Sequence, residues 1–197
     1  MTTTRGDERR GALLASLDEI LREGGSPLDS VNIAEISTRA GVTRSAFYFY
    51  FESKAAAVAA LMEEMYAESL AAAANLREDA SPRENIEATI RDLFATWEKH
   101  QHLFRAMLDA RATSETVRAL WESDRESFVP HLAAVIDDER AAGRAPDGAP
   151  SAALSSVLLE LNDRMLERLS LGGALDREQL VETVVHVWLR SIYGGPS

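Results

Sequence analysis

Guanidinium, hydroxyl and phenol groups are concentrated in one short stretch of the sequence, between residues 39 and 54. Arginine and lysine side chains neutralise phosphate groups, and hydroxyl groups form hydrogen bonds with phosphates and with base edges. These residue types therefore suit contact with the backbone and the grooves of duplex DNA. The candidate contact residues are Arg39, Thr43, Arg44, Ser45, Tyr48, Tyr50 and Lys54.

Two short helices on either side of Gly41 are expected to position these side chains. Asn32 is suited to cap a helix over residues 33–40, and Gly41 is suited to end it in a left-handed conformation. Thr43 is suited to cap a second helix over residues 44–50 and to leave its first N–H groups pointing toward a phosphate. Two short helices joined by a tight glycine turn form a helix-turn-helix.

Helix is also the dominant signal in the rest of the chain, because Ala, Leu, Glu and Arg are abundant and alternating β-branched residues are scarce. The sequence therefore predicts an all-α fold with about nine helices. The other expected helices cover residues 7–23, 53–77, 81–99, 102–111, 114–142 with a kink at Pro130, 151–171 and 176–193.

The composition excludes several classes of protein. A chain of 197 residues with 46% hydrophobic and 27% charged residues has the profile of a soluble globular protein. Because cysteine is absent, disulfides, thiolate zinc sites and cysteine nucleophiles are excluded. No apolar run approaches the roughly 18 residues of a membrane span, and the first residues lack the apolar segment of a secretory signal. We therefore expect a cytoplasmic protein.

The charge is unevenly distributed along the chain. The formal net charge is −11, yet residues 1–54 hold seven basic and eight acidic side chains. The acidity therefore lies mainly in residues 55–197. The total charge argues mildly against DNA binding, whereas its distribution leaves the first segment nearly neutral.

Apolar residues cover a wide arc of the last two expected helices. In the final helix, Leu180, Val184 and Trp188 form one row at a spacing of four residues, and a second apolar row lies beside it. Such coverage exceeds the single stripe of an ordinary surface helix. A four-helix interface between two copies of the chain explains it, and a central helix of a monomer is the alternative.

The segment from residue 30 to residue 54 resembles the DNA-binding domain of the TetR family of bacterial transcriptional repressors. The resemblance is carried by Ala-Gly-Val-Thr at residues 40–43, followed after three residues by Phe-Tyr-x-Tyr-Phe-x-x-Lys. It implies a three-helix DNA-binding domain over residues 1–52 and a larger ligand-binding and dimerisation domain over residues 53–197. It also implies a homodimeric repressor that is released from operator DNA by a small apolar effector and that joins its copies through the last two helices.

Five segments, the first of which lies within the segment just described, are similar to the ethionamide-resistance repressor (EthR) branch of that family. They are residues 47–54, 111–115, 134–140, 161–164 and 186–194. The branch has a long, mostly aromatic ligand channel, and the resemblance places the following residues at the channel: Phe94, Trp97, Phe104, Trp121, Phe128, Asn162, Leu166 and Trp188. The alternative for each aromatic residue is that it simply belongs to the core.

Asn162 discriminates best between a channel and a core, because it interrupts an apolar row. A buried amide needs a hydrogen-bond partner. The partner is either a ligand carbonyl group, which we favour, or a neighbouring helix. Arg125 and His131 lie about one turn from Phe128 on either side and make the expected channel more polar.

Two other classes of protein compete with this interpretation. An enzyme is disfavoured because the four histidines lack the spacing of a metal site and no nucleophile or phosphate-binding motif appears. We expect no cofactor and no metal. A helical protein-interaction module that has lost DNA binding is the second alternative. Residues 137–139, Asp-Asp-Glu, are expected to form a solvated helix face rather than a catalytic or metal-binding cluster.

Overall fold

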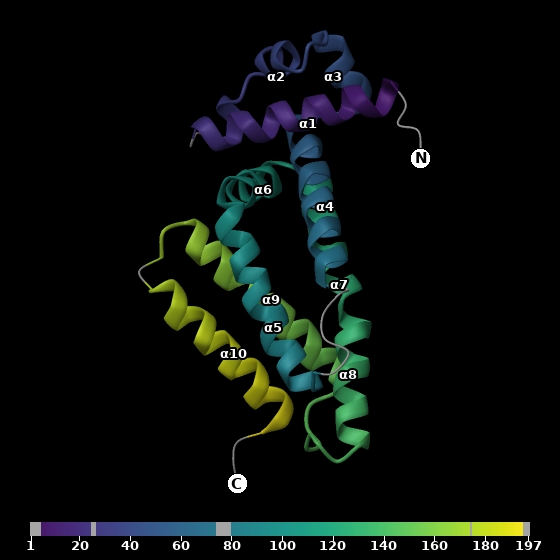
Figure 1. The fold of residues 1–197 in the computed structure, drawn as a ribbon, viewed down its shortest axis with the longest axis vertical. Helices are drawn as coiled ribbons and strands as arrows, with labels where there is room; N and C mark the ends of the chain where they lie inside the picture. The colour runs from purple at the N-terminus through teal and green to yellow at the C-terminus, as the bar shows by residue number, and fades with distance from the viewer. Residues whose placement is uncertain (1–4, 25–26, 74–79, 174, 195–197) are drawn as a thin grey trace. The chain divides into compact units, whose positions relative to one another are not determined.

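The computed structural model describes residues 5–24, 27–73, 80–173 and 175–194, and for residues 66–73 it describes the backbone alone. Every regular element in these ranges is helical, which confirms the all-α prediction, and none of these helices is long and apolar enough to cross a membrane (Figure 1). The elements are α1 (Arg5–Gly24), the 3-10 turn η1 (Leu28–Ser30), α2 (Ile33–Arg39), α3 (Arg44–Tyr50), α4 (Lys54–Ala73), α5 (Pro82–Lys99), α6 (Gln101–Thr113), α7 (Glu115–Ser127), α8 (Val129–Ala141), α9 (Ser151–Ser170) and α10 (Arg177–Tyr193).

The predicted kinked helix over residues 114–142 is wrong, because the structure has two helices there. Phe128 separates α7 from α8. Pro130 lies in the first turn of α8 and explains the break. It has no N–H to donate to the carbonyl of Glu126, and its ring crowds that carbonyl group. The described ranges therefore contain ten α-helices where about nine are predicted.

One compact unit comprises residues 1–70 and 100–120. In this unit α1 contacts α2 and α6, and α2 contacts α3. Figure 1 shows α2 and α3 lying against α1. The side chains of Leu17, Ile36 and Phe47 are completely buried and form the centre of this core. The predicted DNA-binding domain of residues 1–52 lies within this unit, and its boundary at residue 52 stays a prediction.

The second compact unit comprises residues 71–99 and 121–197. In this unit α9 packs between α8 and α10, and α10 also packs against α5 (Figure 1). Phe94, Ile136, Leu158 and Ile192, one from each of these four helices, are buried. The core of the unit thus has α9 at its centre.

The prediction that residues 137–139 form a solvated face is wrong for Glu139, which is only 3% exposed. Gly143, with φ at 71°, turns the chain after α8 and brings Arg144 back to this carboxylate. Arg144 donates two hydrogen bonds to Glu139 Oε1, over 2.9 and 2.6 Å. These bonds outweigh burial and lower the pKa of Glu139. Burial, followed by the charge of Glu139, raises the pKa of Tyr193 to about 12.

Candidate nucleic-acid interface and effector site

The turn between α2 and α3 has the geometry that the sequence predicts. Gly41 has φ at 66°, which L-residues with a side chain rarely adopt. Its N–H donates to Thr38 O over 3.1 Å, and the N–H of Val42 donates to Ser37 O over 2.9 Å. This pair of bonds is a Schellman motif, and it satisfies the last carbonyl groups of α2. The turn therefore fixes the direction in which α3 leaves α2.

Side-chain caps at both helix starts confirm the predicted boundaries. Asn32 Oδ1 accepts a hydrogen bond from the N–H of Ala34 over 2.8 Å, at the start of α2. Thr43 Oγ1 accepts one from the N–H of Ala46 over 3.3 Å, at the start of α3. Each cap satisfies a backbone donor that the first helical turn leaves without a partner.

One face of α3 is buried and the opposite face is exposed. Phe47 is completely buried and packs against Phe51, with 5.6 Å between ring centroids. At about 100° per residue, Ser45 and Phe49 point almost directly away from Phe47. Both are exposed, and Phe49 has 82% of its surface accessible. These two residues form the outermost row of α3, and we call them the outer row.

A second row, Arg44 and Tyr48, flanks the outer row of α3. Arg44 Nη2 donates to Tyr48 Oη over 3.4 Å, and the guanidinium carbon lies 5.8 Å from the centre of the phenol ring. Both side chains are exposed. Tyr50 is half-buried and receives Phe49 edge to face, with 5.0 Å between ring centroids. Four of the predicted contact residues, Thr43, Arg44, Ser45 and Tyr48, thus lie on one exposed surface.

Arg39 is exposed but is held by two carboxylates of its own chain. Its Nη1 lies 2.8 Å from Glu23 Oε2, and its Nη2 lies 2.8 Å from Glu35 Oε1. These hydrogen bonds, that to Glu23 first, raise the pKa of the Arg39 guanidinium. A phosphate that binds Arg39 must therefore share it with Glu23 and Glu35.

Lys54 has a different role in this structure from the predicted phosphate contact. Its Nζ donates to three backbone carbonyl groups, those of Leu28 and Asp29 over 2.8 Å each and that of Val31 over 2.9 Å. An ammonium group has three donors, and all three are engaged. Lys54 therefore ties the segment around η1 to the start of α4.

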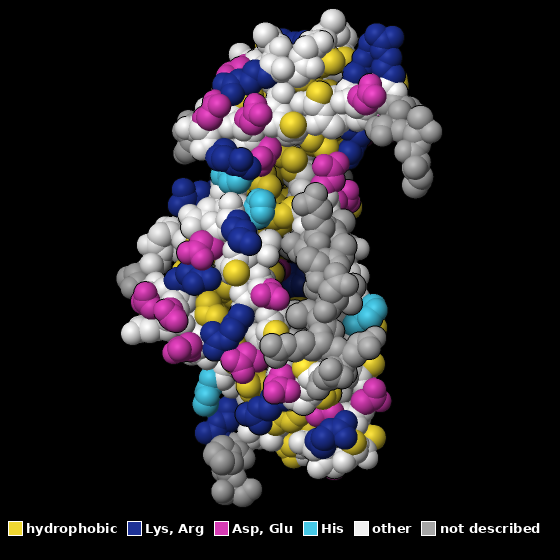
Figure 2. All heavy atoms as spheres, viewed as in Figure 1, with side chains coloured by type: hydrophobic (Ala, Val, Ile, Leu, Met, Phe, Trp, Pro, Cys, Tyr) yellow, Lys and Arg dark blue, Asp and Glu magenta, His cyan; other side chains and the backbone are white. Residues whose placement is uncertain are grey.

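Further cations lie on the first turns of α1, which carry Arg5, Arg9 and Arg10. Figure 2 shows Lys and Arg side chains gathered at this end of the first unit. Arg10 pairs with Glu64 over 2.7 Å and lies over the ring of Phe51. This group adds positive charge to the unit that contains α3.

Three tryptophan side chains converge on α9 in the second unit. Trp97 donates its indole N–H to Ser170 Oγ over 2.8 Å, and Trp188 donates to Asn162 Oδ1 over 3.0 Å. Trp121 donates to Asp163 Oδ2 over 2.9 Å. For Asn162 the structure thus shows a bond to a neighbouring helix, where we favoured a ligand carbonyl group.

Two family models match this chain. The model of the bacterial regulatory proteins of the tetR family matches residues 13–61, and that of the C-terminal domain of the transcriptional regulator EthR matches residues 86–194. The HTH-type transcriptional regulator EthR of Mycobacterium tuberculosis (strain ATCC 25618 / H37Rv) is 34% identical over 194 residues, covering 96% of this chain and 89% of the relative. The chain belongs to the TetR family of bacterial transcriptional regulators.

Other members of the TetR family support this assignment. EthR of Mycolicibacterium smegmatis is 30% identical over 193 residues, covering 96% of this chain and 88% of that protein. A TetR-family regulator from Syntrophomonas wolfei has the same fold, with a TM-score of 0.73, 17% identity and coverage of 94% and 95% of the two chains. Both expected resemblances, to the TetR family and to its EthR branch, are confirmed. The protein is a transcriptional regulator and not an enzyme.

The first unit of this TetR-family chain joins α6 to the segment that the tetR-family model matches, residues 13–61. Asp109 Oδ2, on α6, accepts a hydrogen bond from the backbone N–H of Leu28 over 3.0 Å. His102 Nε2, also on α6, lies 2.7 Å from Asp18 Oδ1 on α1. Two polar contacts thus tie α6 to α1 and to η1, where Lys54 also binds.

The residues predicted for the effector site of this TetR-family chain belong to both units. Phe94, Trp97, Leu166 and Trp188 are buried in the second unit, as is Asn162. Phe104 is buried in the first unit. Phe128, at the break between α7 and α8, is 40% exposed.

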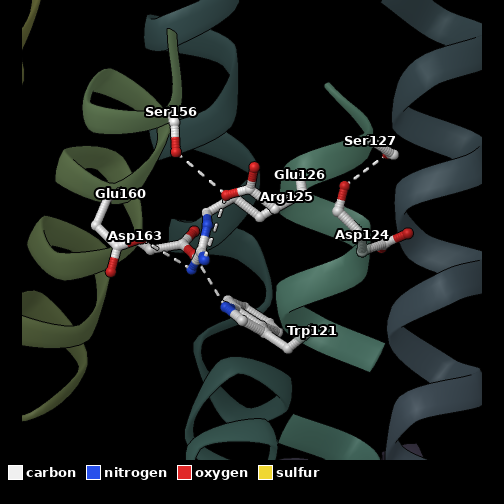
Figure 3. Close-up of polar contacts among 8 residues, drawn as sticks. All are labelled: Trp121, Asp124, Arg125, Glu126, Ser127, Ser156, Glu160 and Asp163. Atoms are coloured by element: carbon white, nitrogen blue, oxygen red, sulfur yellow. Dashed lines mark hydrogen bonds and ion pairs between the residues drawn. The ribbon is translucent and has the colours of Figure 1, made fainter. Parts of the chain in front are cut away.

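The remaining predicted effector residue, Trp121, lies at the edge of an ionic cluster between α7 and α9 (Figure 3). Arg125 Nη1 lies 3.1 Å from Glu160 Oε2 and 3.4 Å from Asp163 Oδ2, the oxygen that Trp121 also binds. Arg125 Nη2 lies 3.7 Å from Glu126 Oε1. One cation therefore faces three carboxylates, which makes this part of the second unit polar, as the sequence predicts from Arg125.

One exposed residue of α3, Phe49, is not among the contact residues predicted from the sequence. Among the side chains that the structure describes, Phe49 is the most exposed large apolar one. The signal is the spacing from Phe47, since two residues along a helix turn the chain by about 200°. A buried Phe47 therefore requires an outward Phe49.

Proposed function

We propose that the chain is a repressor that binds operator DNA as a homodimer and leaves it when a small apolar effector binds the second unit. The observation that supports DNA binding most directly is the exposed surface of α3. It carries Thr43, Arg44, Ser45 and Tyr48 on a helix whose opposite face is anchored by the buried Phe47. A rigidly anchored helix with an exposed polar face is what the major groove accommodates. Since its partner is chromosomal DNA, such a repressor acts in the cytoplasm.

In this proposal Arg44, Ser45 and Tyr48 contact the groove and its walls, and Thr43 and Tyr50 flank them. Arg39 contacts a phosphate that it shares with Glu23 and Glu35. Lys54 contributes indirectly, because it holds the segment that leads into α2 and its three donors are engaged.

Dimerisation through α9 and α10 is supported by apolar side chains that their own unit leaves uncovered. Val157 on α9 and Val187 on α10 are exposed, and Leu154 and Leu161 on α9 are half-buried. Pairing with a second copy removes this apolar surface from water. Light scattering on the purified protein should give the mass of two chains, and Val157→Asp should shift the population toward one chain.

An apolar effector is supported by the aromatic content of the second unit. Trp97, Trp188, Phe94 and Leu166 lie around α9, where Asn162 adds an amide group. FadR from Bacillus subtilis, which was solved in complex with stearoyl-CoA, has the same fold at a TM-score of 0.71 and 16% identity, with 94% and 99% of the two chains covered. The proposed effector therefore has a long apolar part, with Asn162 Nδ2 as a donor to a polar group on it.

A reporter gene placed behind the DNA upstream of the regulator's own gene tests repression. The wild type should lower reporter expression, and Arg44→Ala should restore it. Arg91→Ala is the matched control, because Arg91 is an exposed arginine of α5 that pairs with Glu87. Repression that survives Arg44→Ala would contradict the proposed DNA surface, and higher expression with the wild type would contradict the repressor role.

The tryptophans provide a direct test of effector binding. Fatty acids and fatty-acyl esters of increasing chain length should change the tryptophan fluorescence and should release the protein from its DNA. The same titration with Trp188→Phe should give a smaller signal. Binding of the apolar compounds without release of DNA would contradict the proposed link between the two sites.

A further inference from the structure

Phe49 is unusually exposed to solvent for a large apolar side chain. It is 82% exposed, whereas Phe47 and Phe51 on either side are buried. The buried positions beneath α3 are thus already filled by these two rings, so Phe49 does not fold inward. Its ring lies edge to face against Tyr50 at 5.0 Å, with 88° between the planes, which limits the directions it takes.

The position of Phe49 points to DNA as the surface that covers it. Ser45 lies one turn before Phe49 in the outer row, and the flanking row of Arg44 and Tyr48 lies beside them. Arg44 supplies the positive charge that a phosphate requires. The groups beside the ring can bind the phosphates and bases of a polynucleotide. A protein partner would instead favour a wider apolar patch.

In the major groove, a phenylalanine side chain favours contact with one of the four bases. The ring has no hydrogen-bond donor or acceptor, and it therefore cannot satisfy the polar groups that guanine, adenine and cytosine present there. Thymine differs because its C5-methyl group projects into the major groove and offers an apolar surface. Contact with this methyl group removes apolar area from water on both partners.

We propose that Phe49 is a specificity-determining residue that contacts the C5-methyl group of a thymine in each operator half-site. The proposal rests on the proposed function, because it requires α3 to enter the major groove. Ser45, one turn earlier, then hydrogen-bonds a neighbouring base edge or phosphate. The operator therefore contains, in each half-site, one thymine whose methyl group the protein reads.

The test removes that methyl group alone. Duplexes that bind the wild-type protein are first selected from a random library. Each thymine of the selected sequence is then replaced in turn by deoxyuridine, which keeps the base-pairing edge and lacks the methyl group. Losing one buried methyl group weakens binding about fourfold, and losing one in both half-sites weakens it about fifteenfold.

Protein variants identify which side chain reads the methyl group. Phe49→Ala should bind the thymine and deoxyuridine duplexes equally, and Phe49→Leu should keep part of the difference. Leu120→Ala is the matched control, because Leu120 is an exposed apolar residue of α7 in the same unit. Phe49→Ala changes an exposed side chain, and its helical circular dichroism should match that of the wild type.

Three results would overturn the inference. If no single deoxyuridine substitution weakens binding of the wild type, Phe49 reads no methyl group. If Phe49→Ala keeps the same sensitivity as the wild type, another residue reads it. If the selection enriches no sequence, the proposed function fails, and the inference fails with it. The first two results leave the proposed function intact, so the two failures are distinguishable.

Discussion

Trp188 donates its indole N–H to the side-chain oxygen of Asn162 across 3.0 Å, and both side chains are buried in the second unit. The bond joins α10 to α9. It gives the amide oxygen of Asn162 a structural partner, and Nδ2 is the donor in the proposed effector contact.

Replacing Asn162 by Ala should therefore lower stability as well as effector affinity. The buried indole N–H of Trp188 would lose its acceptor, and a buried unsatisfied donor costs about 1–3 kcal/mol. Urea unfolding of Asn162→Ala, Trp188→Phe and the double variant measures the coupling. We expect a coupling free energy of about 1 kcal/mol, and additive effects would show that the bond contributes nothing.

Releasing Arg39 from Glu35 should strengthen DNA binding. Glu35→Gln removes one of the two carboxylates that share the guanidinium group with any phosphate. It also removes a negative charge from the helix-turn-helix. We expect the affinity for operator DNA to rise about two- to fivefold at low salt and the gain to shrink at high salt.

The matched control for Arg39 is Glu87→Gln, which breaks a comparable pair with Arg91 on α5 of the second unit. It should leave DNA affinity unchanged. A gain of the same size in both variants would mean that only the total charge matters.

Removing the ammonium group of Lys54 should destabilise the first unit. Lys54→Met deprives three backbone carbonyl groups of their donor. A hydrogen bond to a charged group contributes about 1.5–3 kcal/mol. In the variant, water can bind the exposed carbonyl groups, so the total loss is smaller than the sum of three such bonds. We expect the free energy of unfolding in urea to fall by about 2 kcal/mol.

The salt dependence of DNA binding separates the structural role of Lys54 from a phosphate contact. Lys54→Met should leave the salt slope of the folded protein unchanged, whereas Arg44→Ala should reduce the slope by about one unit. Lys99→Met, at an exposed lysine at the end of α5, should change neither quantity. A lower salt slope for Lys54→Met would instead support the predicted contact between Lys54 and a phosphate.

The ion pair of Glu139 and Arg144 should make stability depend on pH in the acid range. The pKa of Glu139 in the folded protein lies below its ordinary value of 4.5, mainly because Arg144 donates to its carboxylate. The stabilisation is therefore fully present above pH 4.5 and is lost as the pH falls through the folded-state pKa.

Arg144→Met should lower the free energy of unfolding at pH 7, because a buried carboxylate loses its donor. Its difference from the wild type should shrink as Glu139 becomes protonated. Arg164→Met, which breaks an exposed pair with Glu167, is the control and should change stability by less than about 0.5 kcal/mol at either pH. A difference that stays constant from pH 7 to pH 3 would exclude Glu139 as its source.

Local features of the fold can be predicted from the sequence because their causes lie within a few residues. Asn32, Gly41 and Thr43 act on backbone groups no more than five residues away, and the structure confirms the turn they predict. Apolar periodicity likewise predicts most helix positions. The break at Phe128 is missed because a proline in a long helical pattern either kinks a helix or ends it, and tertiary packing decides between the two.

The candidate site depends on partners that are distant in sequence, and there the prediction is weaker. The carbonyl groups that bind Lys54 lie 23 to 26 residues earlier, and Asn162 meets Trp188 26 residues later. The sequence does not show which side-chain donors are already hydrogen-bonded to such distant groups. The exposure of Phe49 can be predicted from the sequence, because its spacing from the buried Phe47 places it on the outside of α3.

The central claim is that the exposed surface of α3 binds a specific DNA sequence. Fluorescence anisotropy with DNA from upstream of the regulator's own gene tests this claim most directly, with shuffled DNA as the control and a series of salt concentrations. With Lys54 engaged and Arg10 and Arg39 paired to carboxylates, three to five phosphate contacts per subunit predict a log–log salt slope of about −3 to −4.5 per subunit. We expect tight binding with this slope, which is lost on shuffling and weaker in Arg44→Ala. Equal affinity for the two DNAs, or an affinity independent of salt, would contradict it.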